Sequence, residues 1–184
     1  MYTTSSQTIG PYLHIGMDWA VDPDFAGPGV QGERIEVAGR IVDGDAAPVI
    51  DAMLEIWQAN SHGRYAHPED TRDVPLDPGF TGWGRVTTDD DGRFRFRTIK
   101  PGRVPDPRGG LQAPHFNVTI FMRGMLRQLT TRIYLDGEAD NASDATLASV
   151  PAARRGTLIA RRSGTQYEWN VVLQGANETV FFDV

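Results

Sequence analysis

The stretch His115-Phe116-Asn117 comes closest, in residue types and spacing, to a site that could bind a metal ion. On a β-strand, residues i and i+2 point to the same face, so a His-x-His pair would offer two imidazoles to one ion. Here the second position holds Asn117, whose amide is a poor ligand for a transition metal. If the strand stays regular, Thr119 and Arg123 lie on the same face. The alternative is an exposed polar strand face.

A second group of possible metal ligands lies in the long connection over residues 59–82, which contains His62, His67, Glu69 and Asp70. Connections longer than about 15 residues are usually functional or disordered, and the histidine, carboxylate and aromatic content of this one argues against disorder. The spacing of the four side chains matches no metal motif. The plainer interpretation is a loop whose histidines and carboxylates are solvated.

Three carboxylates followed by a glycine, over residues 89–92, suggest either a calcium loop or a tight turn. A calcium loop needs an acidic or amide side chain at its fifth position, where this sequence has Arg93, and a glutamate at its twelfth. The sequence therefore favours a hairpin turn. No G-x-S-x-G motif and no phosphate-binding glycine loop occurs, so the sequence predicts neither a serine triad nor a nucleotide site.

The bulk composition narrows the class of protein further. Hydrophobic residues make up 40% and charged residues 23% of the 184 residues, as in an ordinary globular domain. The net charge of −6 argues against a nucleic-acid surface. Without cysteine there is no disulfide, thiolate metal site or cysteine nucleophile. No stretch of eighteen apolar residues and no secretory signal is present, so we expect a cytoplasmic protein that does not bind a membrane.

Alternation of apolar and polar residues indicates that the chain is built from strands. The predicted strands span residues 34–42, 51–58, 93–99, 115–122, 129–135, 167–173 and 179–184. Only residues 143–150 suggest a short helix, with Ser143 as the N-cap and Pro151 just after its end. Short strands separated by glycine and proline turns predict an all-β fold, a β-sandwich with long loops and one short helix.

Residues 1–33 differ from the remainder of the chain. Glycines and prolines interrupt any long element there, yet the segment carries Tyr12, Trp19 and Phe25. A solvated tail rarely has three aromatic side chains. We therefore expect an N-terminal docking arm over residues 1–33 and a β-sandwich domain over residues 34–184.

Several motifs resemble those of the intradiol ring-cleavage dioxygenases. They are Leu-Glu-Ile-Trp-Gln-Ala-Asn at 54–60, Gly-Arg-Tyr at 63–65, Pro-Leu-Asp-Pro at 75–78 with Phe80, the run 88–92, and Thr-Ile-Lys-Pro-Gly at 98–102. Their order agrees with that family from about residue 34 to 135. The segments 6–12, 113–115, 121–124 and 179–183 resemble the alpha type of subunit, so the similarity covers nearly the whole chain.

The resemblance implies a ferric site held by two tyrosines and two histidines in catalytic members. The corresponding positions here are Arg72, Val104, His115 and Asn117. Three of the four ligands are replaced, which implies that this chain carries no catalytic residues and no metal. Ferric iron is then expected in a homologous beta subunit.

The resemblance also implies that the chain helps to wall the pocket of that partner. The matching substrate-pocket residues are Gly10, Pro11, Tyr12 and Arg123. The implied reaction inserts dioxygen into protocatechuate, an aromatic small molecule, and yields 3-carboxy-cis,cis-muconate. For Tyr12, a second interpretation is an aromatic anchor that pins the arm.

Two other functions fit parts of the sequence. A β-sandwich binding or structural module that never meets iron would also lack the ligands. The Gly-Pro-Tyr arm and the Phe-x-Arg-Gly strand end favour a subunit over such a module. A self-sufficient homomeric dioxygenase is disfavoured by Arg72 and Val104.

Overall fold

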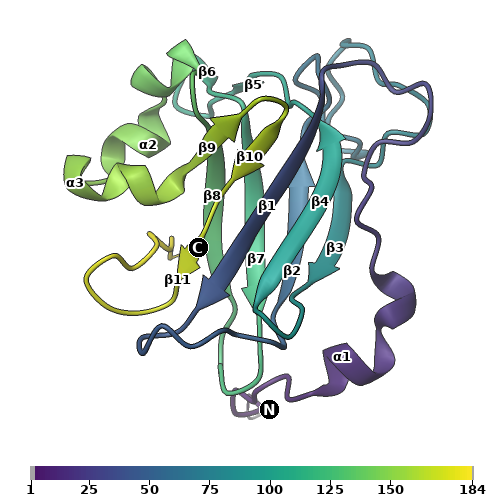
Figure 1. The fold of residues 1–184 in the computed structure, drawn as a ribbon. Helices are drawn as coiled ribbons and strands as arrows, with labels where there is room; N and C mark the ends of the chain where they lie inside the picture. The colour runs from purple at the N-terminus through teal and green to yellow at the C-terminus, as the bar shows by residue number, and fades with distance from the viewer. Residues whose placement is uncertain (1–2, 184) are drawn as a thin grey trace.

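The computed structural model describes residues 3–183, with the side chains of Leu13, His14 and Asp18 left aside, and its strands and short helices are drawn in Figure 1. The strands are β1 (Arg34–Val42), β2 (Met53–Gln58), β3 (Trp83–Thr87), β4 (Arg93–Ile99), β5 (Val104–Pro105), β6 (Leu111–Gln112), β7 (His115–Phe121), β8 (Leu129–Leu135), β9 (Ile159–Ser163), β10 (Gln166–Glu168) and β11 (Val171–Val172). The helical segments are α1 (Tyr12–Gly16), η1 (Asp18–Ala20), η2 (Ala139–Ala142), α2 (Ala145–Ser149), α3 (Ala152–Arg155) and η3 (Gly156–Leu158).

Nine strands join in one sheet whose order is β11-β1-β10-β9-β8-β7-β2-β3, with β4 added by antiparallel pairing to β1. Strand β1 pairs in parallel with both β10 and β11. In Figure 1, β1 and β4 pass in front of β7, β2 and β3, so the sheet curls into two facing layers. The all-β class is confirmed, and the two layers belong to one curled sheet because β9 and β10 connect them.

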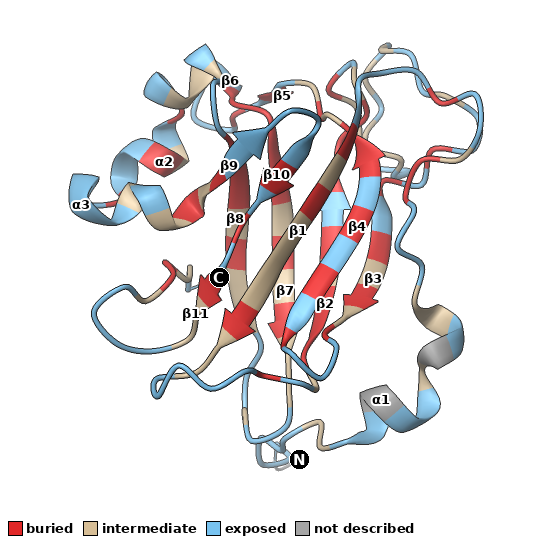
Figure 2. Ribbon diagram, in the orientation of Figure 1, coloured by how far each residue is buried: buried red, intermediate tan, exposed pale blue. Residues whose placement is uncertain are grey.

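The main core lies between these layers. Along β4, Phe94 and Phe96 are buried while the alternate arginines are exposed, as the sequence pattern predicts (Figure 2). The Phe96 ring meets the ring of Phe116 on β7 edge-on, with centroids 5.6 Å apart. Strands of the front and back layers therefore hold each other through aromatic contacts as well as aliphatic burial.

The predicted strands are largely confirmed, with two corrections near the C-terminus. The strand expected over 167–173 is broken at residues 169–170, where Trp169 donates its backbone N–H to Ala38. The strand expected over 179–184 is reduced to one bridge between Phe182 and Thr130, and Val184 lies outside the described residues. These segments are short because each meets only part of a neighbouring strand.

The predicted helix over 143–150 is present as α2, but its cap was assigned one residue too early. Asp144, rather than Ser143, is the N-cap, and its carboxylate accepts the backbone N–H of Leu147. The same carboxylate accepts a hydrogen bond from the hydroxyl of Tyr134 and from the N–H of Ala113. A fully buried carboxylate with three donors was the better cap because it also ties α2 to the sheet.

The N-terminal arm is more ordered than its composition suggested. It forms α1 and η1, and its later part joins the sheet because Asp22 and Phe25 donate to the carbonyls of Arg85 and Arg97. Phe25 is buried and stacks on Phe96, so it is a core residue and not a docking one. Tyr12 and Trp19 remain 74% and 83% exposed.

The acidic segment 89–92 does form a tight turn, in which Asp89 Oδ1 accepts the backbone N–H groups of Asp91 and Arg93. The strands that it joins, β3 and β4, pair with β2 and β1 and not with each other. The prediction of a hairpin was therefore wrong, although the turn was right. Within residues 3–183, no helix is long and apolar enough to cross a membrane.

Candidate functional site

Arg72 and Val104 line a hollow of about 380 Å³ beside the 59–82 loop. They are two of the four positions at which the resemblance implies metal ligands in catalytic members. The ring of Tyr65 forms part of the same wall, and Asn117 Nδ2 donates to its hydroxyl over 3.4 Å. The aromatic side of the hollow is completed by Trp57, whose ring centroid lies 5.1 Å from that of Tyr65. The structure thus brings three of the four positions to one pocket, directly or through Tyr65.

Arg72 is held by a local network of its own loop. Its Nε and Nη2 donate to both carboxylate oxygens of Asp70, and Nη2 also donates to the carbonyl of Gly63. The hydrogen bond from Arg72 is the main cause that lowers the pKa of Asp70 to about 2, so this ion pair persists at neutral pH. The guanidinium thereby ties the loop to itself.

The hydroxyl of Tyr65 is uncharged in this environment. Burial raises the pKa of its hydroxyl above the ordinary value of 10.0, and the hydrogen bond from Asn117 only partly offsets that effect. The side chain therefore stays a neutral phenol at neutral pH.

His115 is buried at the start of β7 and is also uncharged. Its Nδ1 lies 2.7 Å from the carbonyl of Ala113, so Nδ1 carries the proton and donates. Nε2 has no hydrogen-bond partner in the described part of the chain. Burial, helped by the charge of Arg132, lowers the pKa of His115 to about 4. The imidazole of His115 is therefore uncharged at neutral pH.

The four predicted substrate-pocket residues lie at the other end of the molecule. Gly10, Pro11 and Tyr12 belong to the arm, and Arg123 belongs to the turn after β7, which ends at Phe121. Because the strand stops before Arg123, the expectation that Arg123 shares the face of His115 and Asn117 was wrong. Eight residues of strand would separate the two ends by roughly 26 Å.

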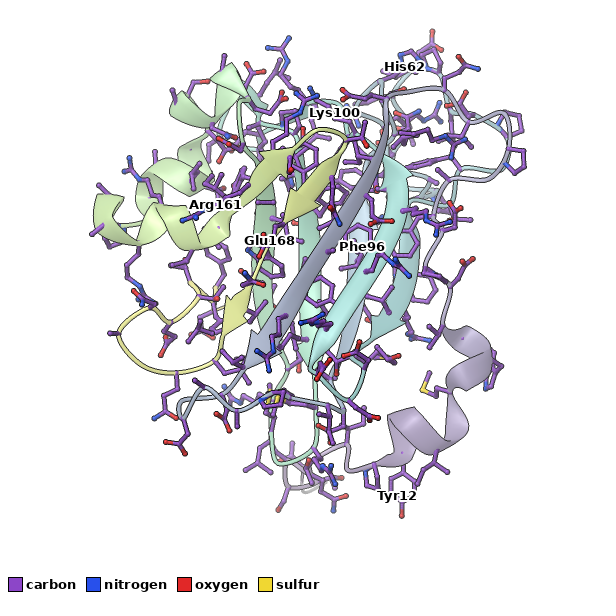
Figure 3. All side chains as sticks on the ribbon, viewed as in Figure 1. Tyr12, His62, Phe96, Lys100, Arg161 and Glu168 are labelled. Atoms are coloured by element: carbon purple, nitrogen blue, oxygen red, sulfur yellow. The ribbon has the colours of Figure 1, made fainter. Side chains whose placement is uncertain are left out.

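The arm and the Arg123 turn are joined by one hydroxyl. Thr8 Oγ1 accepts the backbone N–H of Gly124 at 2.7 Å and that of Gly10 at 3.3 Å. The segment with Gly10, Pro11 and Tyr12 is thereby placed beside Arg123. The side chains of Tyr12 and Arg123 are both exposed. In Figure 3, Tyr12 lies at the bottom of the molecule, opposite the loop that carries His62.

The remaining loop histidines take no part in a ligand cluster. The ring of His67 meets that of Trp57 edge-on at 5.7 Å, and His62 is exposed. Among the side chains that the structure describes, which exclude those of His14 and Asp18, no three His, Asp or Glu come together in an arrangement that could hold a metal ion.

Sequence reasoning missed several contacts of this site. Thr8 was not singled out because an isolated threonine in an irregular arm carries no pattern. The pairing of Asp70 with Arg72 had a signal, since the spacing Asp-x-Arg recurs at Asp106 and Arg108 with the same two-pronged ion pair.

Comparison with known proteins agrees with this geometry. Residues 20–175 match the family model described as "Dioxygenase". The protocatechuate 3,4-dioxygenase alpha chains of Burkholderia cepacia and Pseudomonas putida are 42% and 39% identical, over 98% of this chain and 97% and 96% of theirs. The beta chain from B. cepacia is 39% identical over 80% of this chain and 67% of its own length.

Among solved structures, the dioxygenase domain of a carbohydrate-binding fusion protein from Streptomyces sp. SirexAA-E superposes with a TM-score of 0.64, at 25% identity and 96% coverage of both chains. The catechol 1,2-dioxygenase of Acinetobacter radioresistens shares the fold, with a TM-score of 0.65 and 17% identity over 81% of this chain and 55% of that one. The chain therefore belongs to the intradiol dioxygenase family of oxidoreductases. Two relatives that the chain covers almost completely are alpha chains.

Intradiol dioxygenases depend on a non-heme iron, and the residues at the corresponding positions here do not fit one. Arg72 brings a cation, Val104 has no donor atom, and Asn117 offers an amide that already donates to Tyr65. His115 alone presents a free imidazole nitrogen. One neutral ligand cannot hold ferric iron, which requires anionic oxygen donors beside its nitrogens.

Proposed function

We propose that this chain is the non-catalytic alpha-type subunit of a cytoplasmic protocatechuate 3,4-dioxygenase. A homologous beta subunit carries the ferric iron. The complex inserts dioxygen between the two hydroxyl-bearing carbons of protocatechuate, and both oxygen atoms enter the ring-opened product, 3-carboxy-cis,cis-muconate. This chain supplies part of the pocket wall and the contacts that assemble the complex.

One observation carries the proposal. The polar side chains Arg72 and Asn117 bond to groups within the chain, whereas Tyr12 and Arg123 are exposed and their segments are linked by a hydrogen bond. Arg72 is tied to Asp70, and Asn117 to Tyr65. At the opposite end, Thr8 holds the Gly10 segment beside Gly124, and the Arg123 side chain is 58% exposed. The exposed arm and Arg123 therefore favour a role in the site of another chain.

Arg123 is proposed to attract and orient the carboxylate of protocatechuate. A guanidinium binds a carboxylate through paired, charge-assisted hydrogen bonds. In the mixed oligomer, Arg123→Ala should lower kcat/KM for protocatechuate by a factor of about ten to a hundred, which corresponds to roughly 1.5–3 kcal/mol. Plain catechol, which has no carboxylate, is the matched substrate and should lose much less.

The comparison of the two substrates distinguishes the possible roles of Arg123. A selective loss for protocatechuate supports recognition of the carboxylate. An equal loss for both substrates would mean that Arg123 shapes the pocket or the subunit contact instead. If neither substrate is affected, Arg123 does not belong to the site.

The second candidate is a binding or structural module of the same fold without a catalytic partner. The contacts of Arg72 and Asn117 within the chain favour such a module as much as they favour the subunit. The two differ in assembly, because a module should purify alone from its native source, whereas a subunit should co-purify with an iron-bearing chain.

A further inference from the structure

One carboxylate faces Arg123 across the end of the sheet. Asp51 Oδ2 lies 2.5 Å from Arg123 Nε. Strands β2 and β7 are antiparallel, with Met53 opposite Phe121. Asp51 and Arg123 lie just beyond this last pair of the ladder, and their side chains form an ion pair there.

The two members of this pair differ in burial. The side chain of Asp51 is 14% exposed, whereas that of Arg123 is 58% exposed. The carboxylate thus lies on the protein side and the guanidinium on the solvent side. Asp51 Oδ2 pairs with Arg123 by charge and accepts no hydrogen bond from Nε, and the terminal nitrogens of Arg123 make no hydrogen bond to any described residue. They remain available for a second carboxylate.

The turn that carries Arg123 is also fixed on its other side. The neighbouring Gly124, with φ +83°, donates its N–H to Thr8 of the arm. Arg123 is therefore held by Asp51 through its side chain, while the backbone beside it is held by Thr8. An arginine on a free turn would lose more side-chain entropy on binding than one already oriented.

We propose that Asp51 is a positioning residue that orients Arg123 for the carboxylate of the substrate. This inference rests on the proposed role of Arg123 in the mixed oligomer. Asp51 touches neither the substrate nor the reacting atoms. Through the ion pair, it selects the arrangement in which the terminal nitrogens of Arg123 face outward.

Charge alone makes the opposite prediction. Asp51 is an anion close to a site that must attract an anion, so its removal would strengthen the local attraction for protocatechuate. If Asp51 merely competed for Arg123, Asp51→Asn would lower the KM for protocatechuate. If Asp51 orients Arg123, the same change raises that KM even though the surface becomes more positive.

The test is steady-state kinetics on the mixed oligomer with this chain as wild type, Asp51→Asn or Arg123→Ala. For Asp51→Asn we expect KM for protocatechuate to rise about three- to tenfold, with kcat nearly unchanged and catechol kinetics unaffected. The double variant should be no worse than Arg123→Ala alone, because Asp51 acts only through Arg123.

The matched control is Glu55→Gln, four residues further along the chain. Glu55 lies opposite Arg85 on β3 and forms a carboxylate–guanidinium pair with it. It should leave both substrates unaffected. Thermal unfolding and size-exclusion chromatography of each variant check that the fold and the assembly are retained.

The outcomes separate this inference from the proposed function. If Arg123→Ala costs protocatechuate activity but Asp51→Asn leaves it unchanged or improves it, the positioning role is refuted and the role of Arg123 stands. If Arg123→Ala has no effect, both are refuted. A rise in KM for protocatechuate alone, absent in Glu55→Gln, supports the inference.

Discussion

Arg72 and Asn117 lie at two of the positions where the resemblance implies metal ligands, and both have hydrogen-bond partners within the chain. Arg72 lies in an ion pair with Asp70, and Asn117 donates to Tyr65. A buried or half-buried polar group without a partner is costly, so these contacts stabilise both side chains. The hollow beside Arg72 is therefore organised by hydrogen bonds within the chain.

The first residue-scale prediction concerns colour and iron content. Because Arg72, Val104 and Asn117 cannot replace tyrosinate and imidazole donors, the purified chain should contain far less than one iron per chain. It should also lack the broad visible band of tyrosinate bound to ferric iron. Elemental analysis and a visible spectrum measure both, and the mixed oligomer is the positive control. Stoichiometric iron in the chain alone would contradict the prediction.

The second residue-scale prediction is that protonation of His115 makes the stability of the fold depend on pH. Its pKa is about 4 in the folded chain, against 6.5 for the ordinary side chain, so the unfolded state takes up the proton first as the pH falls. The stabilisation is complete above pH 6.5 and is lost progressively towards pH 4. The contribution of this group is about 3 kcal/mol.

Denaturant unfolding at several pH values between 4 and 6.5 measures this effect. His115→Gln should flatten the pH dependence, because an amide does not titrate. The exposed His67, changed in the same way, is the matched control. Parallel curves for wild type and His115→Gln would refute the assignment.

At the scale of elements, strand β1 depends on a glycine in its middle. A Cβ added to Gly39 would lie 1.8 Å from the carbonyl oxygen of Trp169 and 2.8 Å from the ring of Phe94. Gly39→Ala should therefore push β1 from the chain at residue 169 and cost about 3 kcal/mol in the free energy of unfolding.

Chemical denaturation measures that cost, and Gly156→Ala is the matched control. A Cβ at Gly156 would meet nothing within 4 Å, and its φ of −58° suits any residue. This control should be neutral or slightly stabilising. Equal unfolding curves for wild type and Gly39→Ala would show that β1 can shift without cost.

The elements differ in how far the sequence could predict them. Strands β1, β4 and β8 were predicted to the residue because apolar and polar side chains alternate along them. Strand β3 (Trp83–Thr87) was missed because its buried positions are Gly84 and Val86, a weak pattern. Helix α1 was missed because the glycine and proline before it suggested an irregular chain.

The site was predictable only in part for a similar reason. Similarity of motifs located Arg72, Val104 and Asn117, but it could not show which loop groups those side chains would bind. The prediction that His115 and Arg123 share a strand face failed because the alternation of faces holds only while the strand continues. Strand β7 ends at Phe121. Contacts between distant segments, such as Thr8 with Gly124, have no periodic signal.

At the scale of the whole molecule, the exposed face of the arm determines how the chain behaves alone. Tyr12, Ile15 and Trp19 are each more than 70% exposed, and apolar groups of this size favour burial against another chain. Expressed alone, the chain should self-associate. Expressed with its beta partner, it should elute from size-exclusion chromatography as a stable mixed oligomer.

Deletion of residues 1–21 tests the role of the arm in this assembly. The fold should survive, because the arm first bonds to the sheet at Asp22, which donates to Arg85. Circular dichroism should therefore stay native while the mixed oligomer is lost. A shortened chain that still assembles would place the contact elsewhere.

The pairing of β1 also decides when, during synthesis, this protein can finish folding. Glu36 lies opposite Arg97, 61 residues later, and opposite Gln166, 130 residues later. On the ribosome, one edge of β1 stays unpaired until the segment around Gln166 has emerged, and such an edge can pair with other chains. A product cut short before Gln166 cannot complete the layer around β1. Prematurely terminated chains should therefore be cleared by proteases or aggregate, and they should not enter the oligomer as defective subunits.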